Sequence, residues 1–267
     1  MQQGKSWPNL MSVGLRNELR QPLLNKDLYL QTYNWETWYK YMKEGAAAVN
    51  TANPNVLIFL SGLNSDTDLS PVVQGTALTP GTAKFAASDF PAKKLVLELH
   101  TYDNSATDCA ALQDKLFRAG FQALTNGTNV FPVAMTEFGF PQDATTWKGV
   151  YASCLEAYIP AQGAGWMIWV LAGSYYTREG IQDYDEGWGL LTHDWSGWRS
   201  PEHINGGLVP MVKATLANAK NPVTGTGSPQ PAGTNPPGSS SPQTRVFGDG
   251  FTAVILLAFL AGVARVI

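Results

Sequence analysis

Two glutamates carry the chemistry that this sequence offers, because each lies at the end of a short apolar run. Glu137 lies within Val133–Phe140, and Glu18 follows a run that begins at Ser12. A carboxylate at the end of a buried strand is costly unless it is paired or used. Glu137 alone could cap a helix or face solvent, but the same pattern at Glu18 favours a functional pair. Two such acids meet the basic need of glycoside hydrolysis.

The two glutamates need a scaffold that brings the ends of separate strands together. Apolar runs alternate with helical patterns, which is typical of a parallel α/β architecture. Catalytic side chains of a barrel of parallel strands come from the carboxyl ends of different strands and meet on one face. The sequence predicts strands over residues 8–15, 56–60, 95–99, 133–137 and 165–170, and helices over residues 38–49, 112–123, 147–158 and 211–219.

The composition restricts the possible partners. Of the 267 residues, 44% are hydrophobic, which is enough for a sizeable core. The 18 basic and 21 acidic residues leave a net charge of -3, and they form no basic stripe that would follow phosphates, so nucleic acid is not expected. The two cysteines belong to no CxxC motif and no Cys/His cluster, so we predict no metal site.

Four short motifs occur at the predicted strand ends in the order seen in glycoside hydrolase family 5. They are LRNELR at residues 15–20, ELHTY at 98–102, TEFG at 136–139 and WMIW at 166–169. The chain resembles a fungal, cellulase-like member of this family over about residues 5–220. The resemblance implies a (β/α)8 TIM barrel that acts on a β-linked polysaccharide or oligosaccharide without a cofactor.

The resemblance assigns roles to the residues of the first and third motifs. Glu18 would be the acid/base and Glu137 the nucleophile of a retaining mechanism. The carboxyl groups of such a pair lie about 5 to 5.5 Å apart. Asn17 would hold the 2-hydroxyl of the sugar.

Three more residues complete the implied site. Tyr102 would donate a hydrogen bond to Glu137, His100 would contact the substrate, and Trp169 would lie under the sugar at the cleavage point. The residues alone leave alternatives open, since His100 could be satisfied by a backbone carbonyl and Trp169 could pack in the core.

Other acids and one long loop lie outside these motifs. Glu98 points away from its apolar neighbours, and we expect a structural role for it. The acids at 183, 185 and 186 could line the substrate cleft or lie in a solvated loop. The loop over residues 61–91 is rich in Gly, Ser, Thr and Asp, and a loop of this length is expected to be functional.

The chain departs from the family pattern at its start. Glu18 resembles the acid at the end of the fourth barrel strand, so residues 1–220 are expected to form strands four to eight of a partial barrel. Closure takes eight strands in a typical barrel. We therefore expect the carboxyl-terminal part of a longer enzyme, inactive or unstable alone because open strand edges invite aggregation.

Cys109 opens one predicted helix and Cys154 lies within the next, and these two helices are sequence neighbours in the barrel wall. We predict that the two cysteines are close enough to form a disulfide, which an oxidising secretory route would allow. Two buried free thiols are the alternative.

The last residues differ in composition from the rest. Residues 221–245 are rich in Pro, Gly and Ser and predict a disordered linker, and residues 246–267 form an apolar tail. The small residues 238–241, a polar spacer and this tail match a GPI-type lipid-anchor signal, with attachment near Ser239 to Ser241. A short membrane helix is the alternative. We expect a monomer that is secreted or held at the cell surface.

The leading hypothesis is a retaining β-glycosidase, and most specifically an endo-β-1,4-glucanase. Other β-glycan specificities, such as mannan, β-1,3-glucan or a glycosylated lipid, would use the same fold and the same pair of acids. A non-catalytic, truncated carbohydrate-binding protein of the cell surface is a hypothesis of a different class.

Overall fold

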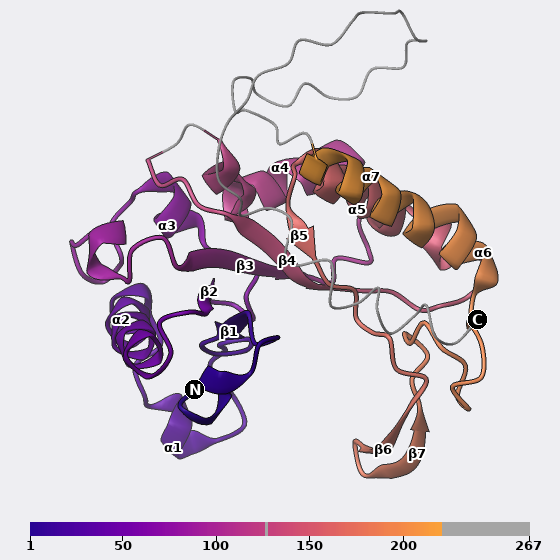
Figure 1. The fold of residues 1–267 in the computed structure, drawn as a ribbon, viewed down its shortest axis with the longest axis horizontal. Helices are drawn as coiled ribbons and strands as arrows, with labels where there is room; N and C mark the ends of the chain where they lie inside the picture. Colours follow the sequence, from indigo (N-terminus) through magenta and orange to yellow (C-terminus); the bar gives the residue numbers. More distant parts are fainter. Residues whose placement is uncertain (126–127, 221–267) are drawn as a thin grey trace, which may run out of the picture.

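The structure, a computed structural model, describes residues 1–125 and 128–220. Its centre is a curved, five-stranded parallel sheet in the order β1-β2-β3-β4-β5 (Figure 1). The strands are β1 (Ser12–Gly14), β2 (Leu57–Ser61), β3 (Leu95–Thr101), β4 (Val133–Phe138) and β5 (Gly165–Trp166). Consecutive strands are neighbours and all run in one direction, so the described residues form a half-barrel.

The central strands follow from their apolar sequences. Every residue of β3 is buried, as expected for a parallel strand covered on both faces. The predicted outer strands were too long, because β1 covers only part of residues 8–15 and β5 stops at Trp166. In the described sheet each of these two strands pairs on one side only, so fewer ladder hydrogen bonds hold it extended.

The longer helices are those that the sequence predicts. Asn34 accepts a hydrogen bond from the backbone of Thr37 at the start of α2, and Asp108 does the same for Ala111 at the start of α4, so both helices are capped. The α-helices are α1 (Lys26–Tyr29), α2 (Trp35–Ala52), α3 (Ser70–Gln74), α4 (Cys109–Ala119), α5 (Val150–Ala161), α6 (Pro201–His203) and α7 (Val209–Lys220). Short 3-10 turns occur at Gln3–Ser6, Ala87–Asp89, Phe121–Leu124 and Thr146–Lys148, and a π-helical turn at Ile204–Leu208 joins α6 to α7.

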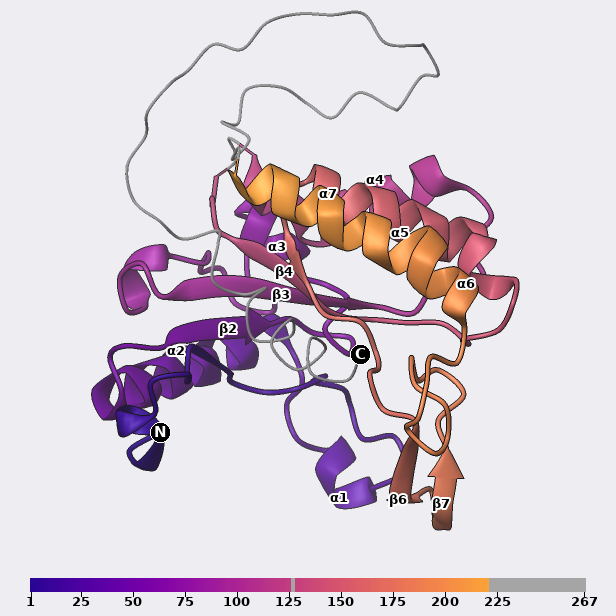
Figure 2. The ribbon, with the colours of Figure 1, turned by 45° about the vertical axis from the view of Figure 1, so that its right-hand side comes forward.

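The helices cover the outer side of the sheet. Helices α4, α5 and α7 lie together beside β3, β4 and β5, and α2 lies beside β2 (Figures 1 and 2). The main core fills the space between helices and sheet, with fully buried side chains such as Leu97, Met135 and Phe121. A smaller cluster of Phe59, Val96 and Ala134 lies on the other face of the strands.

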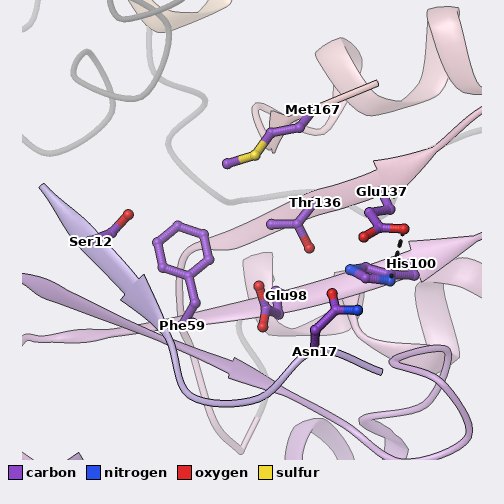
Figure 3. A pocket seen from close by; sticks show the side chains of 9 residues that line it. Ser12, Asn17, Phe59, Glu98, His100, Thr136, Glu137 and Met167 are labelled. Atoms are coloured by element: carbon purple, nitrogen blue, oxygen red, sulfur yellow. Dashed lines mark ion pairs between the residues drawn. The ribbon is translucent and has the colours of Figure 1, made fainter. Parts of the chain in front are cut away.

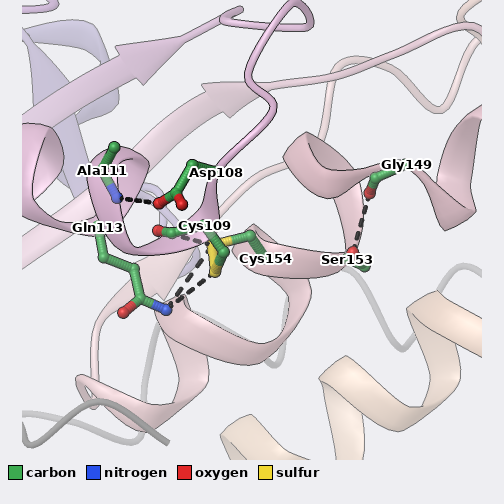
Figure 4. The surroundings of a disulfide bond; sticks show 7 residues. All are labelled: Asp108, Cys109, Ala111, Gln113, Gly149, Ser153 and Cys154. Carbon is green, nitrogen blue, oxygen red and sulfur yellow. Dashed lines mark hydrogen bonds between the residues drawn. A yellow bond between two sulfur atoms is a disulfide. The ribbon is translucent and has the colours of Figure 1, made fainter.

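A disulfide joins Cys109 at the start of α4 to Cys154 in α5 (Figure 4). The two Cα atoms are 5.6 Å apart, within the range that a disulfide spans. The predicted pairing is therefore confirmed, and it closes a loop across two helices of the outer layer.

An antiparallel hairpin follows the last strand of the half-barrel. It consists of β6 (Ser174–Arg178) and β7 (Ile181–Asp185), and it extends away from the helical layer (Figure 2). Sequence analysis predicted no strands between Gly173 and Trp198. Glu179 and Gly180, both with positive φ, form the two-residue turn that such hairpins require.

No helix within residues 1–125 and 128–220 combines the length and the apolar character needed to cross a membrane. The predicted linker at residues 221–245 and the predicted anchor signal at 246–267 lie outside the described residues.

Candidate active site

The carboxyl ends of β1, β3 and β4 bring three of the predicted side chains together. Glu18 follows β1, His100 is near the end of β3, and Glu137 is near the end of β4. One ring nitrogen of His100 and one carboxylate oxygen of each glutamate lie within 4.8 Å of one another. The two acids are therefore as close as the sequence analysis expected.

His100 lies at the centre of this group and is almost completely buried. Its Nδ1 atom is 3.2 Å from Oε1 of Glu18 and 3.6 Å from Oε2 of Glu137. On the other side of the ring, Nε2 is 3.8 Å from Oδ2 of Asp66. The imidazole thus faces carboxylates on both sides, rather than the backbone carbonyl that was the alternative for His100.

Tyr102 fixes the second glutamate. Its hydroxyl donates a hydrogen bond of 2.8 Å to Oε2 of Glu137, as the motif implied. Burial raises the pKa of Tyr102 above its ordinary value, and the Glu137 carboxylate raises it further. The hydroxyl therefore remains a hydrogen-bond donor throughout the neutral range.

The backbone at Glu18 is unusual, since its φ of 47° lies in the left-handed region. Its N–H donates a 2.7 Å hydrogen bond to Oδ2 of Asp66, and its side chain forms an ion pair with Arg20. The sequence predicts that the loop over residues 61–91 is functional, but no motif in it marks Asp66 as the residue that acts. The available signal was the run of turn-forming residue types Asn64, Ser65 and Asp66, and in the structure all three have positive φ.

A pocket of about 240 Å³ lies on the open face of the strands beside these residues. Asn17 lines this pocket with His100 and Glu137, as Figure 3 shows. The rest of its lining comes from strands β1 to β4 and from the residue after β5, namely Ser12, Gly14, Phe59, Glu98, Thr136 and Met167.

Glu98 also points into the pocket, although the sequence analysis treated it as structural (Figure 3). The side chain is 8% exposed. Burial raises the pKa of Glu98 to about 7, and the charges of Asp66 and Glu137 act in the same direction. Glu98 therefore adds to Glu18, Glu137 and Asp66 a fourth carboxyl group, whose pKa lies near neutral pH.

Trp169 is not part of the pocket lining, but it is half-buried next to the hairpin. Its ring centre is 5.8 Å from the guanidinium carbon of Arg178, which also lies over the rings of Tyr175 and Tyr184. Arg178 in turn forms an ion pair with the buried Glu186. The hairpin thus contacts Trp169 through Arg178.

The sequence left undecided whether the acids at 183, 185 and 186 line the substrate cleft or lie in a solvated loop, and the structure places them in different environments. Glu186 is buried and also accepts a hydrogen bond from the backbone of Trp188. Asp185 pairs with Arg199, and Asp183 contacts His193. None of these three acids lines the described pocket.

The arrangement places Glu18, which can donate or accept a proton, close to the Glu137 carboxylate, which Tyr102 holds by a hydrogen bond. Two carboxyl groups at this separation suit a displacement through a covalent glycosyl intermediate. The same two acids and His100 could also serve as oxygen and nitrogen ligands of a cation. The sequence expectation of no metal remains a prediction.

Comparison with known proteins defines the class. The model of the cellulase family, glycosyl hydrolase family 5, matches residues 6–174. The chain belongs to this family.

A glycosyl hydrolase 5 family protein from Chamaecyparis obtusa is 33% identical over 213 residues, which are 74% of this chain and 34% of that protein. The chain therefore spans about a third of the length of this relative. A particular similarity to fungal members remains a prediction.

Solved structures share the fold at low sequence identity. The catalytic domain of the major endoglucanase from Xanthomonas campestris is 20% identical, with a TM-score of 0.54 over 81% of this chain and 59% of that one. The β-glucanase of Saccharophagus degradans in complex with cellotetraose is 15% identical, with a TM-score of 0.53 over 80% and 56%. The chain spans little more than half of these structures.

Proposed function

We propose that this chain carries the catalytic pair of a retaining β-glycosidase that cleaves a β-1,4-linked glucan within the polymer. The observation that supports this most directly is the meeting of Glu18 and Glu137 around His100, with the Tyr102 hydroxyl bonded to Glu137. Membership of the cellulase family and the fold shared with endoglucanases support the class of substrate.

In the first step, the Glu137 carboxylate attacks the anomeric carbon while Glu18 gives its proton to the departing glycosidic oxygen. The bond to the leaving sugar breaks and a glycosyl ester forms on Glu137. In the second step, Glu18 removes a proton from water, and the resulting hydroxide displaces Glu137. The product keeps its anomeric configuration and both acids return to their starting states.

The remaining residues would bind and orient the sugar. Asn17 lines the pocket next to the catalytic pair and would hold the 2-hydroxyl. Trp169 would present an aromatic face to the sugar ring, and His100 would contact the substrate between the two acids. A monomer is sufficient for this mechanism, because every named side chain comes from one chain.

The replacement Glu137→Gln tests the assignment of the nucleophile in an active preparation of the enzyme. We expect turnover of soluble β-1,4-glucan to fall by at least about a thousandfold, since a neutral amide cannot form the glycosyl ester. Glu137→Gly with azide should regain turnover and give a glycosyl azide of inverted configuration. Near-normal turnover by Glu137→Gln would reject this role.

A panel of soluble glucans and mannans tests the substrate. Preferred cleavage of mixed-linked or carboxymethylated β-1,4-glucan would support the proposal, whereas preference for mannan, β-1,3-glucan or a glycolipid would point to those alternatives. Tight binding of a polymer without hydrolysis would favour a non-catalytic carbohydrate-binding protein.

We also propose that the protein is secreted or held at the cell surface by a lipid anchor. The disulfide between Cys109 and Cys154 supports an oxidising compartment. Release of the protein from intact cells by a phosphatidylinositol-specific phospholipase would support the anchor, and retention of residues 246–267 in the mature protein would contradict it.

A further inference from the structure

The mechanism above leaves one completely buried carboxylate without a role. Asp66 lies in the β2–α3 loop, which we define as residues 62–69, and its side chain has no exposed surface. Oδ2 accepts the N–H of Glu18, whereas Oδ1 finds no hydrogen-bond partner among the described residues. A buried and incompletely paired carboxylate is costly, which indicates that its position serves the site.

The hydrogen bond that Asp66 accepts from Glu18 lies where the backbone is strained. Glu18 adopts a left-handed backbone conformation, which a residue with a side chain occupies only when its surroundings impose it. In this conformation the N–H points to Asp66 and the carboxylate points to His100. Asp66 is therefore the direct partner of the backbone turn that orients the acid/base.

Contacts from this loop and from two residues outside it, Tyr33 and Ser61, hold the residues on either side of Glu18. Ser65 donates its N–H to the carbonyl of Leu19 at 2.9 Å, and Tyr33 donates its hydroxyl to the same carbonyl. On the other side, the hydroxyl of Ser61, at the end of β2, donates to the carbonyl of Arg16 at 2.6 Å. The segment that carries Glu18 is thus fixed from both sides.

Asp66 also contacts the central imidazole. Its own carbonyl accepts the N–H of His100 at 2.9 Å, and its carboxylate lies 3.8 Å from Nε2 of the same residue. Burial raises the pKa of Asp66 to about 6, while the N–H of Glu18 and the charge of His100 counteract this rise. At neutral pH the carboxylate is therefore still largely ionised.

We propose that Asp66 is a positioning residue for Glu18: by accepting the N–H of Glu18, it holds the left-handed turn that directs the Glu18 carboxylate toward His100 and Glu137. The assignment of Glu18 as the acid/base rests on the proposed function. The role of Asp66 in holding the backbone turn at Glu18 does not depend on the proposed function.

The kinetic test compares two leaving groups in an active preparation of the enzyme. Phenyl β-cellobioside needs a proton from the enzyme, whereas 2,4-dinitrophenyl β-cellobioside loses its leaving group without one. For Asp66→Ala we expect kcat/KM to fall by about a hundredfold or more on the phenyl substrate. The fall on the dinitrophenyl substrate should be far smaller. Azide should accelerate turnover of the second substrate and give a glycosyl azide of retained configuration.

Two further variants separate positioning from general damage. Asp66→Asn keeps an oxygen that can accept the N–H of Glu18, so its loss on the phenyl substrate should lie between those of wild type and Asp66→Ala. Asp68→Asn changes an acid of the same loop that bonds to the backbone of Ser70 instead, and it should leave both substrates unaffected. Equal losses of Asp66→Ala on both substrates, in a protein that still unfolds cooperatively, would overturn the proposal.

A crystal structure of Asp66→Ala tests the geometry without any turnover. We expect Glu18 to leave the left-handed region and its Oε1 atom to move away from Nδ1 of His100, beyond the 3.2 Å of the native site. An unchanged Glu18 would overturn the positioning role even in an active glycosidase. A displaced Glu18 in a protein that cleaves none of the glycosides would support the positioning role and reject the proposed function.

Discussion

At the residue scale, the site concentrates acidic groups around one imidazole. Glu18, Glu137 and Asp66 contact His100 directly, and Glu98 lines the same pocket. Burial raises the pKa values of Asp66 and Glu98 to about 6 and about 7. These two groups take up protons as the pH falls through the range in which the proposed catalytic pair would hold different protonation states.

Replacement of Glu98 by Gln should change how stability depends on pH. The folded protein holds a proton on Glu98 up to about pH 7, whereas the unfolded chain loses it near the ordinary value of 4.5. Stability is therefore lost as the pH rises from about 4.5 through 7. Glu98→Gln should raise the free energy of unfolding at pH 8 by on the order of 2–3 kcal/mol and change it little at pH 4.

Urea unfolding at both pH values measures this effect. Glu44→Gln, a change of an exposed acid on α2, provides the matched control and should show no such difference. An equal effect of Glu98→Gln at pH 4 and pH 8 would show that packing, rather than ionisation, determines the result.

Replacement of Tyr102 by Phe removes the hydrogen bond that the Tyr102 hydroxyl donates to Glu137. A hydrogen bond to a charged group contributes about 1.5–3 kcal/mol, so kcat should fall by roughly ten- to a hundredfold. KM should change much less, because the ring remains in place. Steady-state kinetics measure both constants, and Tyr41→Phe, which changes an exposed tyrosine of α2, is the matched control. An unchanged kcat of Tyr102→Phe would contradict a role of the Tyr102 hydroxyl in the proposed reaction.

The sequence identified Glu18, His100 and Glu137 as site residues. It did not single out Asp66, and it gave Glu98 a structural role although Glu98 lies in one of the family motifs. Glu18, His100 and Glu137 end apolar runs and could be found from that pattern. Asp66 belongs to an irregular loop, where no periodicity marks a side chain as buried. Glu98 alternates with buried leucines of β3, and only the curvature of the sheet decides that its face lines the pocket.

At the scale of elements, the periodicity of apolar residues located the central strands and longer helices correctly. The ends of β1 and β5 were overestimated, because an apolar run does not reveal how many neighbours a strand has. The hairpin of β6 and β7 was missed since its residues are largely exposed and polar. Its turn at Glu179 and Gly180 was the only local signal.

The disulfide between α4 and α5 should stabilise the outer layer without affecting the chemistry. It closes a loop of 45 residues, for which restriction of the unfolded chain predicts a stabilisation of about 2–4 kcal/mol. The double replacement Cys109→Ser with Cys154→Ser should lower the free energy of unfolding by this amount. Urea unfolding with and without a reductant measures it, since the reductant should affect only the wild type.

Activity of the double variant at 25 °C provides the complementary measurement. Both cysteines lie in the helical layer and neither lines the pocket. We therefore expect kcat to remain within about twofold of the wild type at a temperature where both proteins are folded. A large loss of kcat would indicate that the two helices transmit strain to β3 and β4.

At the scale of the whole molecule, the described residues form half of a barrel, and the carboxyl ends of its strands bring Glu18, His100 and Glu137 together. The strand order and the positions of Glu18 and Glu137 follow from the motifs, because the family fixes which strand carries which residue. Sequence could not show how the inner face is arranged in a partial barrel. That face carries the pocket and the small apolar cluster of Phe59, Val96 and Ala134.

The shortness of the outer strands has a consequence for association in solution. In the described sheet, β1 has three residues and β5 has two, so each free edge presents only a few backbone groups to another chain. Very short edge strands are one of the ways in which proteins avoid edge-to-edge pairing. These short edges offer less template for intermolecular sheets than the open edges expected from the sequence, and the expectation of aggregation itself stays a prediction. Exposure of the longer strands β2 and β4 would first require β1 and β5 to detach.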